Sequence, residues 1–325
     1  MGARHAIAGR PLGGATAEVL VLGATSLVGS HFVEYGRFGV AAAGRASPAA
    51  AGLRVERFTE LDVSQPELVR AVVRSAPETV VVNFAARTDV DPVERERSAP
   101  TAPGGTAWTV NALAPEAVAS ASRTSGKFFV QISTDFVFDG VDGPYDERAA
   151  RSPFSDRVSW YGWTKSEGER LASEAGSEMA IVRISFPYRA TFSRKLDFAR
   201  RMLERYRQGS LPPLYANQQI TPTWVPDVTE ALGVVIRRRL AGVFHVASPE
   251  VTSPLEFGRE LIGRVEGSAP ALPAGTLEAP RPGSGIAPRP IRGGLRSRRS
   301  EELGIRPTPW RRGIERLANG EEGGA

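Results

Sequence analysis

Glu18-Val-Leu-Val-Leu-Gly23-Ala-Thr-Ser26-Leu-Val-Gly29 decides the fold of this chain. The four apolar residues before its first glycine are typical of a buried strand, and the stretch from Leu27 to Phe38 has the pattern of a helix. Glycines at a strand–helix junction allow a tight turn, close backbone approach and close packing of the helix on the strand. Because the N–H groups at the start of a helix attract phosphate, the stretch predicts a dinucleotide-binding turn.

Strand and helix patterns alternate through the first half of the chain. We expect strands at residues 40–44, 55–58, 79–83, 127–133 and 179–185, and helices at 65–74, 107–124 and 161–175. Repeated units of this kind give an α/β fold of the Rossmann type, a doubly wound parallel sheet with helices on both faces. Beyond Pro187 we expect helices at 197–208, 227–238 and 310–318, a strand at 242–247 and a loop at 268–290.

This change of rhythm predicts two unequal lobes. Residues 17–186 would form the dinucleotide-binding domain, and residues 224–248 would return to it. Residues 187–223 and 249–318 would form a smaller C-terminal α/β lobe that binds substrate. Residues 1–16 would be a flexible leader, because they lack the apolar core of a signal peptide, and 319–325 a tail. Residues 97–108, with their prolines and glycines, look like an inserted loop.

The composition excludes several classes of protein. The chain has 325 residues, 41% of them hydrophobic and 24% charged, and no apolar run long enough to span a membrane. It has no cysteine, so disulfides and cysteine metal sites are excluded, which suits a cytoplasmic protein. Arginines between residues 281 and 312 contribute much of the net charge of +5 and could attract a phosphorylated small molecule. No nucleic-acid-binding motif accompanies them, so we expect no nucleic acid partner.

Tyr161 and Lys165 are the strongest candidates for chemistry on the predicted helix at 161–175. The chain has only three lysines among 41 basic residues, and one of them stands four residues after a tyrosine. Residues four apart lie on one helix face, so phenol and ammonium can point into the same cleft. Because a neighbouring cation lowers the pKa of a phenol, Tyr161 could be a proton donor whose pKa is adjusted by Lys165. An exposed helix face is the alternative interpretation.

Arg45 bears on the choice of cofactor. It follows the predicted strand at 40–44, and no acidic residue stands between that strand and Glu56. An acid at this position would hold the 2′-hydroxyl of NAD(H), whereas an arginine accommodates a 2′-phosphate. The sequence therefore favours NADPH, with NADH as the alternative.

Further segments resemble a known family. They are Leu61-Asp62-Val63, Asn83-Phe-Ala-Ala-Arg-Thr-Asp-Val-Asp91, Ser133-Thr-Asp-Phe-Val-Phe-Asp-Gly140 and the stretch from Tyr161 to Lys165. With the glycine turn they are similar to the extended short-chain dehydrogenase/reductases, and within that group to the dTDP-4-dehydrorhamnose reductase family. The segment from Ser133 to Gly140 is the most specific of them. The resemblance covers roughly residues 19–318, with the motifs in the family's order.

The resemblance implies a role for each matching residue. It implies that Tyr161 is the general acid and that Lys165, Thr134 and Asn111 are the other catalytic residues. Contacts to the cofactor would come from the same Tyr161 and Lys165 and from Gly23, Thr25, Ser26, Leu27, Val28, Gly29, Arg45, Asp62, Val63, Phe84, Ala85, Ala86 and Phe186, with Pro187 and Tyr188 also beside the nicotinamide. Contacts to the substrate would come from Asp135, Phe136, Val137, Trp163, Gln219, Thr223 and Arg289.

The chain departs from the family's pattern at several positions. Ser26 replaces the middle glycine of the turn and places a hydroxymethyl group where the backbone is usually bare. His31 stands where some relatives have a magnesium-binding glutamate, so we expect no metal. Phe136 lacks the hydroxyl of the family's tyrosine, and Trp163 adds bulk near Tyr161. These changes affect the identity of the substrate more than the type of reaction.

The resemblance implies NADPH-dependent reduction of the 4-keto group of a nucleotide-linked 4-keto-6-deoxyhexose, with dTDP as the nucleotide. Phe136 stands where a sugar-nucleotide 4,6-dehydratase typically has a glutamate, which disfavours that activity. A sugar-nucleotide 4-epimerase of the same superfamily remains an alternative, since it retains its cofactor and needs no acid there. A non-catalytic NADP-binding regulatory subunit is the alternative from another class. We expect a cytoplasmic protein without membrane partners, and a homodimer is left open.

Overall fold

A seven-stranded parallel sheet forms the centre of the larger lobe. The computed structural model describes residues 18–98, 106–191, 196–268, 271–278 and 286–321. The strand order is β3-β2-β1-β4-β5-β6-β8, and every neighbouring pair is parallel. The strands are β1 (Val19–Leu22), β2 (Val40–Gly44), β3 (Arg57–Glu60), β4 (Val80–Asn83), β5 (Phe128–Thr134), β6 (Met179–Ile184) and β8 (Gly242–Val246). The predicted doubly wound α/β sheet is confirmed.

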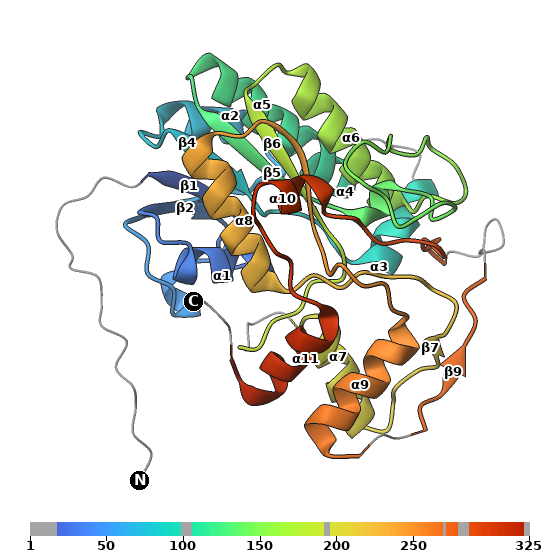
Figure 1. Cartoon of the computed structure of the whole chain (residues 1–325). Helices are drawn as coiled ribbons and strands as arrows, with labels where there is room; N and C mark the ends of the chain where they lie inside the picture. Colours follow the sequence, from blue (N-terminus) through green and yellow to red (C-terminus); the bar gives the residue numbers. More distant parts are fainter. Residues whose placement is uncertain (1–17, 99–105, 192–195, 269–270, 279–285, 322–325) are drawn as a thin grey trace, which may run out of the picture.

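Helices cover both faces of the sheet (Figure 1). Helices α1 (Leu27–Tyr35) and α8 (Val225–Arg238) share one core with Val19 and Val21. Helices α2 (Pro66–Ser75), α5 (Ala114–Thr124) and α6 (Trp160–Glu174) share the other core with Leu20 and Leu22. Successive side chains of a strand point to opposite faces, and both faces of β1 are buried. This burial explains why its sequence is a continuous apolar run.

The smaller lobe packs around its own aromatic core, which includes Trp224, Phe257 and Trp310. It contains α7 (Phe198–Arg207), α9 (Pro254–Glu266), α11 (Trp310–Asn319) and the short parallel pair β7 (Leu214–Tyr215) and β9 (Ala274–Gly275). Figure 1 shows these elements grouped beyond one end of the sheet. The remaining short elements are α3 (Val90–Glu94), α4 (Thr106–Trp108), α10 (Arg298–Glu302), a π-helical turn at Thr109–Leu113 and 3-10 turns at Ala49–Ala51, Arg95–Ser98 and Asp135–Val137. None of the described helices is long and apolar enough to span a membrane.

The segment predicted as a helix at 107–124 is helical throughout, but it is not one regular α-helix. It is interrupted by the π-helical turn, in which the Ala114 N–H bonds to the carbonyl of Thr109. Pro115 has no N–H to donate to the carbonyl of Asn111, so the regular helical ladder cannot continue there. The other predicted elements lie within a few residues of their observed positions. Residues 99–105, within the expected insertion, and the expected leader at 1–16 lie outside the described residues.

Candidate active site

A cavity of about 700 Å³ opens at the carboxyl ends of the sheet strands. Its walls come from the turn after β1, the segments after β2, β3, β4, β5 and β6, helix α6 and the start of α7. In open α/β sheets this edge is where ligands bind. Within the described residues this cavity is therefore the candidate ligand-binding site.

The glycine turn has the geometry that its sequence predicts. Gly23 has φ +77°, and a Cβ on it would lie 2.7 Å from the backbone nitrogen of Ala85. A Cβ on Gly29 would lie 2.5 Å from the carbonyl oxygen of Gly23, so this glycine allows α1 to pack on the turn. Ser26 has φ −70°, which a serine adopts without strain, and its hydroxyl accepts a hydrogen bond from the Gly29 N–H at 3.1 Å. Ser26 therefore caps α1, and the turn keeps its shape despite the lost glycine.

The predicted cofactor-binding residues come together around this turn. All of them line the cavity except Gly29, which packs beneath the turn, and Tyr188. Arg45 and Asp62 follow β2 and β3 on one wall. Hydrogen bonds from Ser64 lower the pKa of Asp62, and the Arg45 cation contributes to this shift. A cation and an ionised carboxylate therefore stand side by side where the adenosine end of a dinucleotide would lie.

Thr134, Tyr161 and Lys165 all line the same cavity. Tyr161 and Lys165 lie one turn apart on α6, and the Thr134 hydroxyl, at the end of β5, hydrogen bonds to the phenol. Lys165 Nζ donates to the carbonyl oxygen of Ile132 at 2.7 Å. A Cβ on Gly162 would lie 2.0 Å from the carbonyl oxygen of Phe136, so this glycine lets α6 approach the turn after β5. The sequence predicted this trio correctly as neighbours.

The electrostatics of the trio differ from the sequence prediction. Burial raises the pKa of Tyr161 above its usual range, and this effect outweighs the hydrogen bond from Thr134. Asp135 raises that pKa further, because its negative charge disfavours a phenolate. Burial also lowers the pKa of Lys165 from 10.5 to about 8, against the opposing effect of Glu169. The expected lowering of the Tyr161 pKa is therefore wrong, and the phenol keeps its proton.

The Asn111 side chain hydrogen bonds to the backbone of Arg87 and does not face the cavity. Its Oδ1 accepts from the Arg87 N–H at 2.9 Å, and its Nδ2 donates to the Arg87 carbonyl oxygen at 3.0 Å and to Thr164 Oγ1 at 3.1 Å. The side chain is 1% exposed, and among the described residues it does not line the cavity. We therefore correct its predicted catalytic role: Asn111 fixes the loop after β4 against α6.

Two of the predicted substrate residues, Asp135 and Phe136, line the cavity. The Phe136 ring lies 5.7 Å from the ring of Tyr161 and 6.1 Å from that of Phe186. Phe186 has φ +43°, a left-handed conformation that is rare for a bulky residue, and this backbone turn places it on the cavity wall. Trp163 is half-buried against Phe154, with ring centroids 5.1 Å apart, and is not one of the described lining residues.

Three predicted contacts are wrong because the side chains are fully buried elsewhere. Val137 packs in a separate core cluster with Phe138. Thr223 donates to the carbonyl oxygen of Val246 at 2.8 Å and has no exposed surface. Tyr188 belongs to the core of the smaller lobe. None of the three can touch a ligand in the cavity with its side chain.

The remaining predicted substrate residues lie on the C-terminal segment or pair with it. The Gln219 N–H donates to the carbonyl oxygen of Ile291 at 2.7 Å. Arg289 makes a two-pronged ion pair with Asp91, at 2.8 and 2.9 Å. Neither residue lines the cavity within the described part of the chain. The Arg289 charge is already matched by a carboxylate, so we correct its predicted contact with the substrate's phosphates.

The sequence matches a family model over residues 17–322, that of the RmlD substrate binding domain. It is 32% identical to a dTDP-4-dehydrorhamnose reductase of Burkholderia thailandensis over 271 residues, which cover 78% of this chain and 85% of the relative. The chain belongs to the dTDP-4-dehydrorhamnose reductase family. It is also 31% identical to a probable dTDP-4,6-dihydroxy-2-methyloxan-3-one 4-ketoreductase of Streptomyces antibioticus, over 78% of this chain and 88% of that protein.

Solved structures of the family have the same fold. A dTDP-4-dehydrorhamnose reductase of Clostridium acetobutylicum superposes with a TM-score of 0.74 at 27% identity, covering 93% of this chain and 98% of that one. The Bacillus anthracis reductase, solved in complex with NADP, superposes with a TM-score of 0.71 at 25% identity, covering 93% of this chain and 99% of that one.

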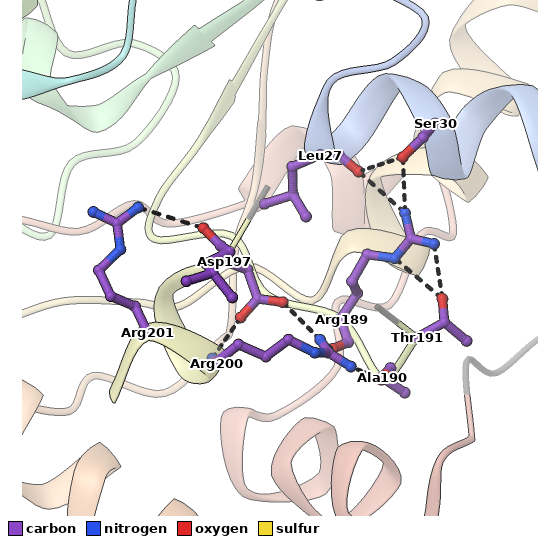
Figure 2. Close-up of polar contacts among 9 residues, drawn as sticks. Leu27, Ser30, Arg189, Ala190, Thr191, Asp197, Arg200 and Arg201 are labelled. Atoms are coloured by element: carbon purple, nitrogen blue, oxygen red, sulfur yellow. Dashed lines mark hydrogen bonds and ion pairs between the residues drawn. The ribbon is translucent and has the colours of Figure 1, made fainter. Parts of the chain in front are cut away.

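In this member of the dTDP-4-dehydrorhamnose reductase family the two lobes are joined at a buried arginine (Figure 2). Arg189 donates to the Leu27 carbonyl oxygen at 3.2 Å and to Ser30 Oγ at 3.1 Å, so it holds the first turn of α1. Arg200, on α7, donates in turn to the Arg189 carbonyl oxygen at 2.6 Å and to Asp197 at 2.9 Å. The smaller lobe is thereby fixed to the helix that follows the glycine turn.

Arg201 is a cavity residue that the sequence prediction missed. Figure 2 shows it beside Arg200 but directed away from that network. It lines the cavity, is exposed, and its guanidinium makes one long hydrogen bond, 3.4 Å, to the Leu196 carbonyl oxygen. Arg87, after β4, also lines the cavity, and no carboxylate pairs with either arginine among the described residues. The sequence did offer one signal for Arg201: the first turn of α7 carries arginines and no acid, although the N-terminus of a helix normally favours acidic residues.

Proposed function

We propose that the protein reduces the 4-keto group of a nucleotide-linked 4-keto-6-deoxyhexose with NADPH, and that the nucleotide is dTDP. The observation that carries this proposal is the meeting of Thr134, Tyr161 and Lys165 in the cavity that begins at the glycine turn. The relatives' names and the NADP complex of the Bacillus anthracis reductase support it.

The residues around the turn fit a dinucleotide. The absent Cβ of Gly23 leaves the backbone of the turn open beside Ala85, and the Gly29 position admits no side chain. We propose that the turn holds the pyrophosphate, that Asp62 and Val63 contact adenine, and that Arg45 contacts a 2′-phosphate. NADPH supplies a hydride when it is bound.

The protein's part in the reaction is to position the ketone and supply a proton. Tyr161, kept protonated by burial, would donate its proton to the carbonyl oxygen as negative charge develops there. Thr134 would hydrogen bond to the same oxygen from the end of β5. Lys165, largely charged below its pKa of about 8, would hold the ribose of the cofactor next to the phenol.

We propose that Arg201 and Arg87 take the diphosphate of the nucleotide sugar. Both line the cavity without a carboxylate partner, whereas Arg289 is paired with Asp91. Arg201→Gln should then raise the Michaelis constant for the nucleotide sugar by roughly tenfold or more while leaving that for NADPH unchanged. Arg205→Gln, an exposed position at the other end of the same helix, is the matched control.

The decisive experiment is to measure NADPH oxidation with dTDP-4-keto-6-deoxyglucose and a panel of related keto sugars. We expect turnover by the wild-type protein and none by Tyr161→Phe, which should still bind NADPH. Tight NADPH binding without turnover on any keto sugar would instead support the regulatory subunit. In a separate assay with a nucleotide-linked hexose that carries a 4-hydroxyl group, formation of its C4 epimer without net oxidation of NADPH would support the epimerase.

The smaller lobe, with α7 at the cavity, would bind the sugar nucleotide under this proposal. A cytoplasmic location and a homodimer remain predictions from the sequence. The product's configuration at the reduced carbon, measured by NMR, would identify the sugar.

A further inference from the structure

A buried carboxyl group lies directly behind the Thr134 hydroxyl. Asp135 is 2% exposed and accepts a hydrogen bond from Ser185 Oγ at 2.7 Å on Oδ2, while its Oδ1 lies 3.3 Å from Thr134 Oγ1. Among the described residues no lysine, arginine or histidine forms an ion pair with it. A buried carboxylate without a cation is costly, and burial raises the pKa of Asp135 to about 6. The group can therefore be neutral or ionised close to neutral pH.

The hydrogen-bonding capacity of Thr134 makes this protonation state consequential. A hydroxyl group has one proton and two lone pairs. The Phe136 N–H, 3.2 Å from Thr134 Oγ1, occupies one lone pair in either state. If Asp135 is ionised, the Thr134 proton points to its Oδ1 and is not available to a ligand in the cavity. If Asp135 is protonated, its own O–H can occupy the second lone pair, which leaves the Thr134 proton free to point into the cavity.

We propose that Asp135 is a positioning residue that sets the direction of the Thr134 hydroxyl, and that its protonated form is the active one. If the proposed function is correct, Thr134 and Tyr161 both donate to the ketone oxygen of the substrate when Asp135 is protonated. In the ionised form Asp135 accepts the Thr134 proton, which then cannot be donated to the ketone oxygen. Asp135 itself need not touch the reacting atoms.

The groups around Asp135 come from three neighbouring elements. Helix α6 contributes Tyr161, which is neutral, and Lys165, whose ammonium is held by the carbonyl of Ile132. Ser185, after β6, and the backbone N–H of Gly294 donate to the carboxyl group and favour its ionised form. Lys165 titrates near pH 8, well above Asp135, so the two titrations are separable.

The test is the pH dependence of kcat between pH 5 and 8 at saturating NADPH and keto sugar. For the wild-type protein kcat should fall about tenfold per pH unit above the pKa of Asp135, toward a lower plateau. Asp135→Asn should remove this dependence, because the amide N–H donates to Thr134 at every pH and the amide oxygen still accepts from Ser185. Its kcat at pH 8 should therefore exceed that of the wild-type protein.

Two further variants separate positioning from a structural role. Ser185→Ala removes a donor that stabilises the carboxylate, so the fall in kcat should move to higher pH by roughly one unit. Asp139→Asn, whose carboxyl group receives the Tyr145 hydroxyl on the same loop, should keep the wild-type profile. Independently of activity, the infrared carbonyl band of a neutral carboxylic acid should titrate in the wild-type protein and be missing in Asp135→Asn.

The outcomes distinguish this inference from the proposed function. A wild-type protein that reduces no keto sugar refutes the proposed function and the inference with it. An active wild-type protein whose fall in kcat survives in Asp135→Asn, or does not move in Ser185→Ala, overturns the inference alone. Loss of activity at every pH in an Asp135→Asn variant that still binds NADPH overturns it too, because the ionised carboxylate would then be required.

Discussion

Replacing Lys165 by methionine should abolish reduction and yet stabilise the folded protein at pH 7. Lys165 is 4% exposed, and the carboxylate that favours its charge, Glu169, is already bound by Arg183 at 2.6 and 2.9 Å. The fall of the Lys165 pKa from 10.5 to about 8 corresponds to a cost of roughly 3 kcal/mol for keeping the charge in the folded state. Methionine removes that cost but leaves the buried Ile132 carbonyl without a hydrogen-bond donor. The unsatisfied carbonyl lowers the stability of the variant by about 1–3 kcal/mol. We expect a net gain of about 1 kcal/mol.

The sign of this effect should reverse with pH. Between pH 8 and 10.5 the unfolded chain binds the Lys165 proton and the folded protein does not, so the stability of the wild-type protein rises with pH there. The variant has no such group, and above pH 10 it should be the less stable of the two. Urea unfolding at pH 7 and pH 10, followed by circular dichroism, measures both differences in free energy.

Lys127→Met is the matched control. Its ammonium group is also buried but lies away from the cavity, donating to the carbonyl oxygens of Ala76 and Glu78, each at 2.6 Å. Burial lowers the pKa of Lys127 as well, but methionine here would leave two carbonyl groups without their donor instead of one. We therefore expect this variant to be less stable than the wild-type protein at pH 7 and to retain activity. If Lys165→Met is destabilised by the same margin at both pH values, its buried charge is not costly and the reasoning fails.

Three further substitutions test the turn, the helix packing and the cofactor preference. Ser26→Ala removes the acceptor of the Gly29 N–H and should lower the free energy of unfolding by about 1 kcal/mol, measured by urea unfolding. Gly168→Ala would place a Cβ 2.0 Å from the carbonyl oxygen of Asn111, so α6 must shift, and a loss of about 2 kcal/mol or more should appear in the same measurement. Arg45→Glu should raise the Michaelis constant for NADPH about tenfold or more while changing that for NADH far less, in steady-state kinetics.

The order and type of the main elements were predictable because periodicity and turn residues act locally. The first strand, its glycine turn and the helix at Leu27 follow from one short stretch. Helix α9 was missed although its signals are also local: Ser253 caps it by accepting from the Glu256 N–H, and Gly267, with φ +76°, ends it. Its apolar residues pack into the smaller lobe, where no regular strand–helix rhythm draws attention to them.

The candidate site was predictable only as far as its residues have distinctive chemistry. Motif neighbours at a strand end, such as Asp135 and Val137, can point into a cavity or into a core, and the sequence does not distinguish the two. Polar residues are ambiguous in the same way, because the type of Asn111 or Thr223 does not reveal that its partners are backbone groups. Arg201 was missed since an exposed arginine on an amphipathic helix looks ordinary until the cavity beside it is known.

The Tyr161–Lys165 pair shows why spacing alone did not predict the electrostatics of the site. A neighbouring cation lowers the pKa of a phenol in water, but here burial acts on both groups and raises the pKa of Tyr161 while lowering that of Lys165. A high pKa does not prevent Tyr161 from acting as the acid, because the alkoxide that forms on hydride addition is a stronger base than a phenolate. Burial then guarantees that the donor carries its proton at every working pH. Under the proposed function Lys165 would therefore bind the cofactor's ribose rather than lower the pKa of Tyr161, and the direction of the Thr134 hydroxyl would be the feature of the site that changes with pH.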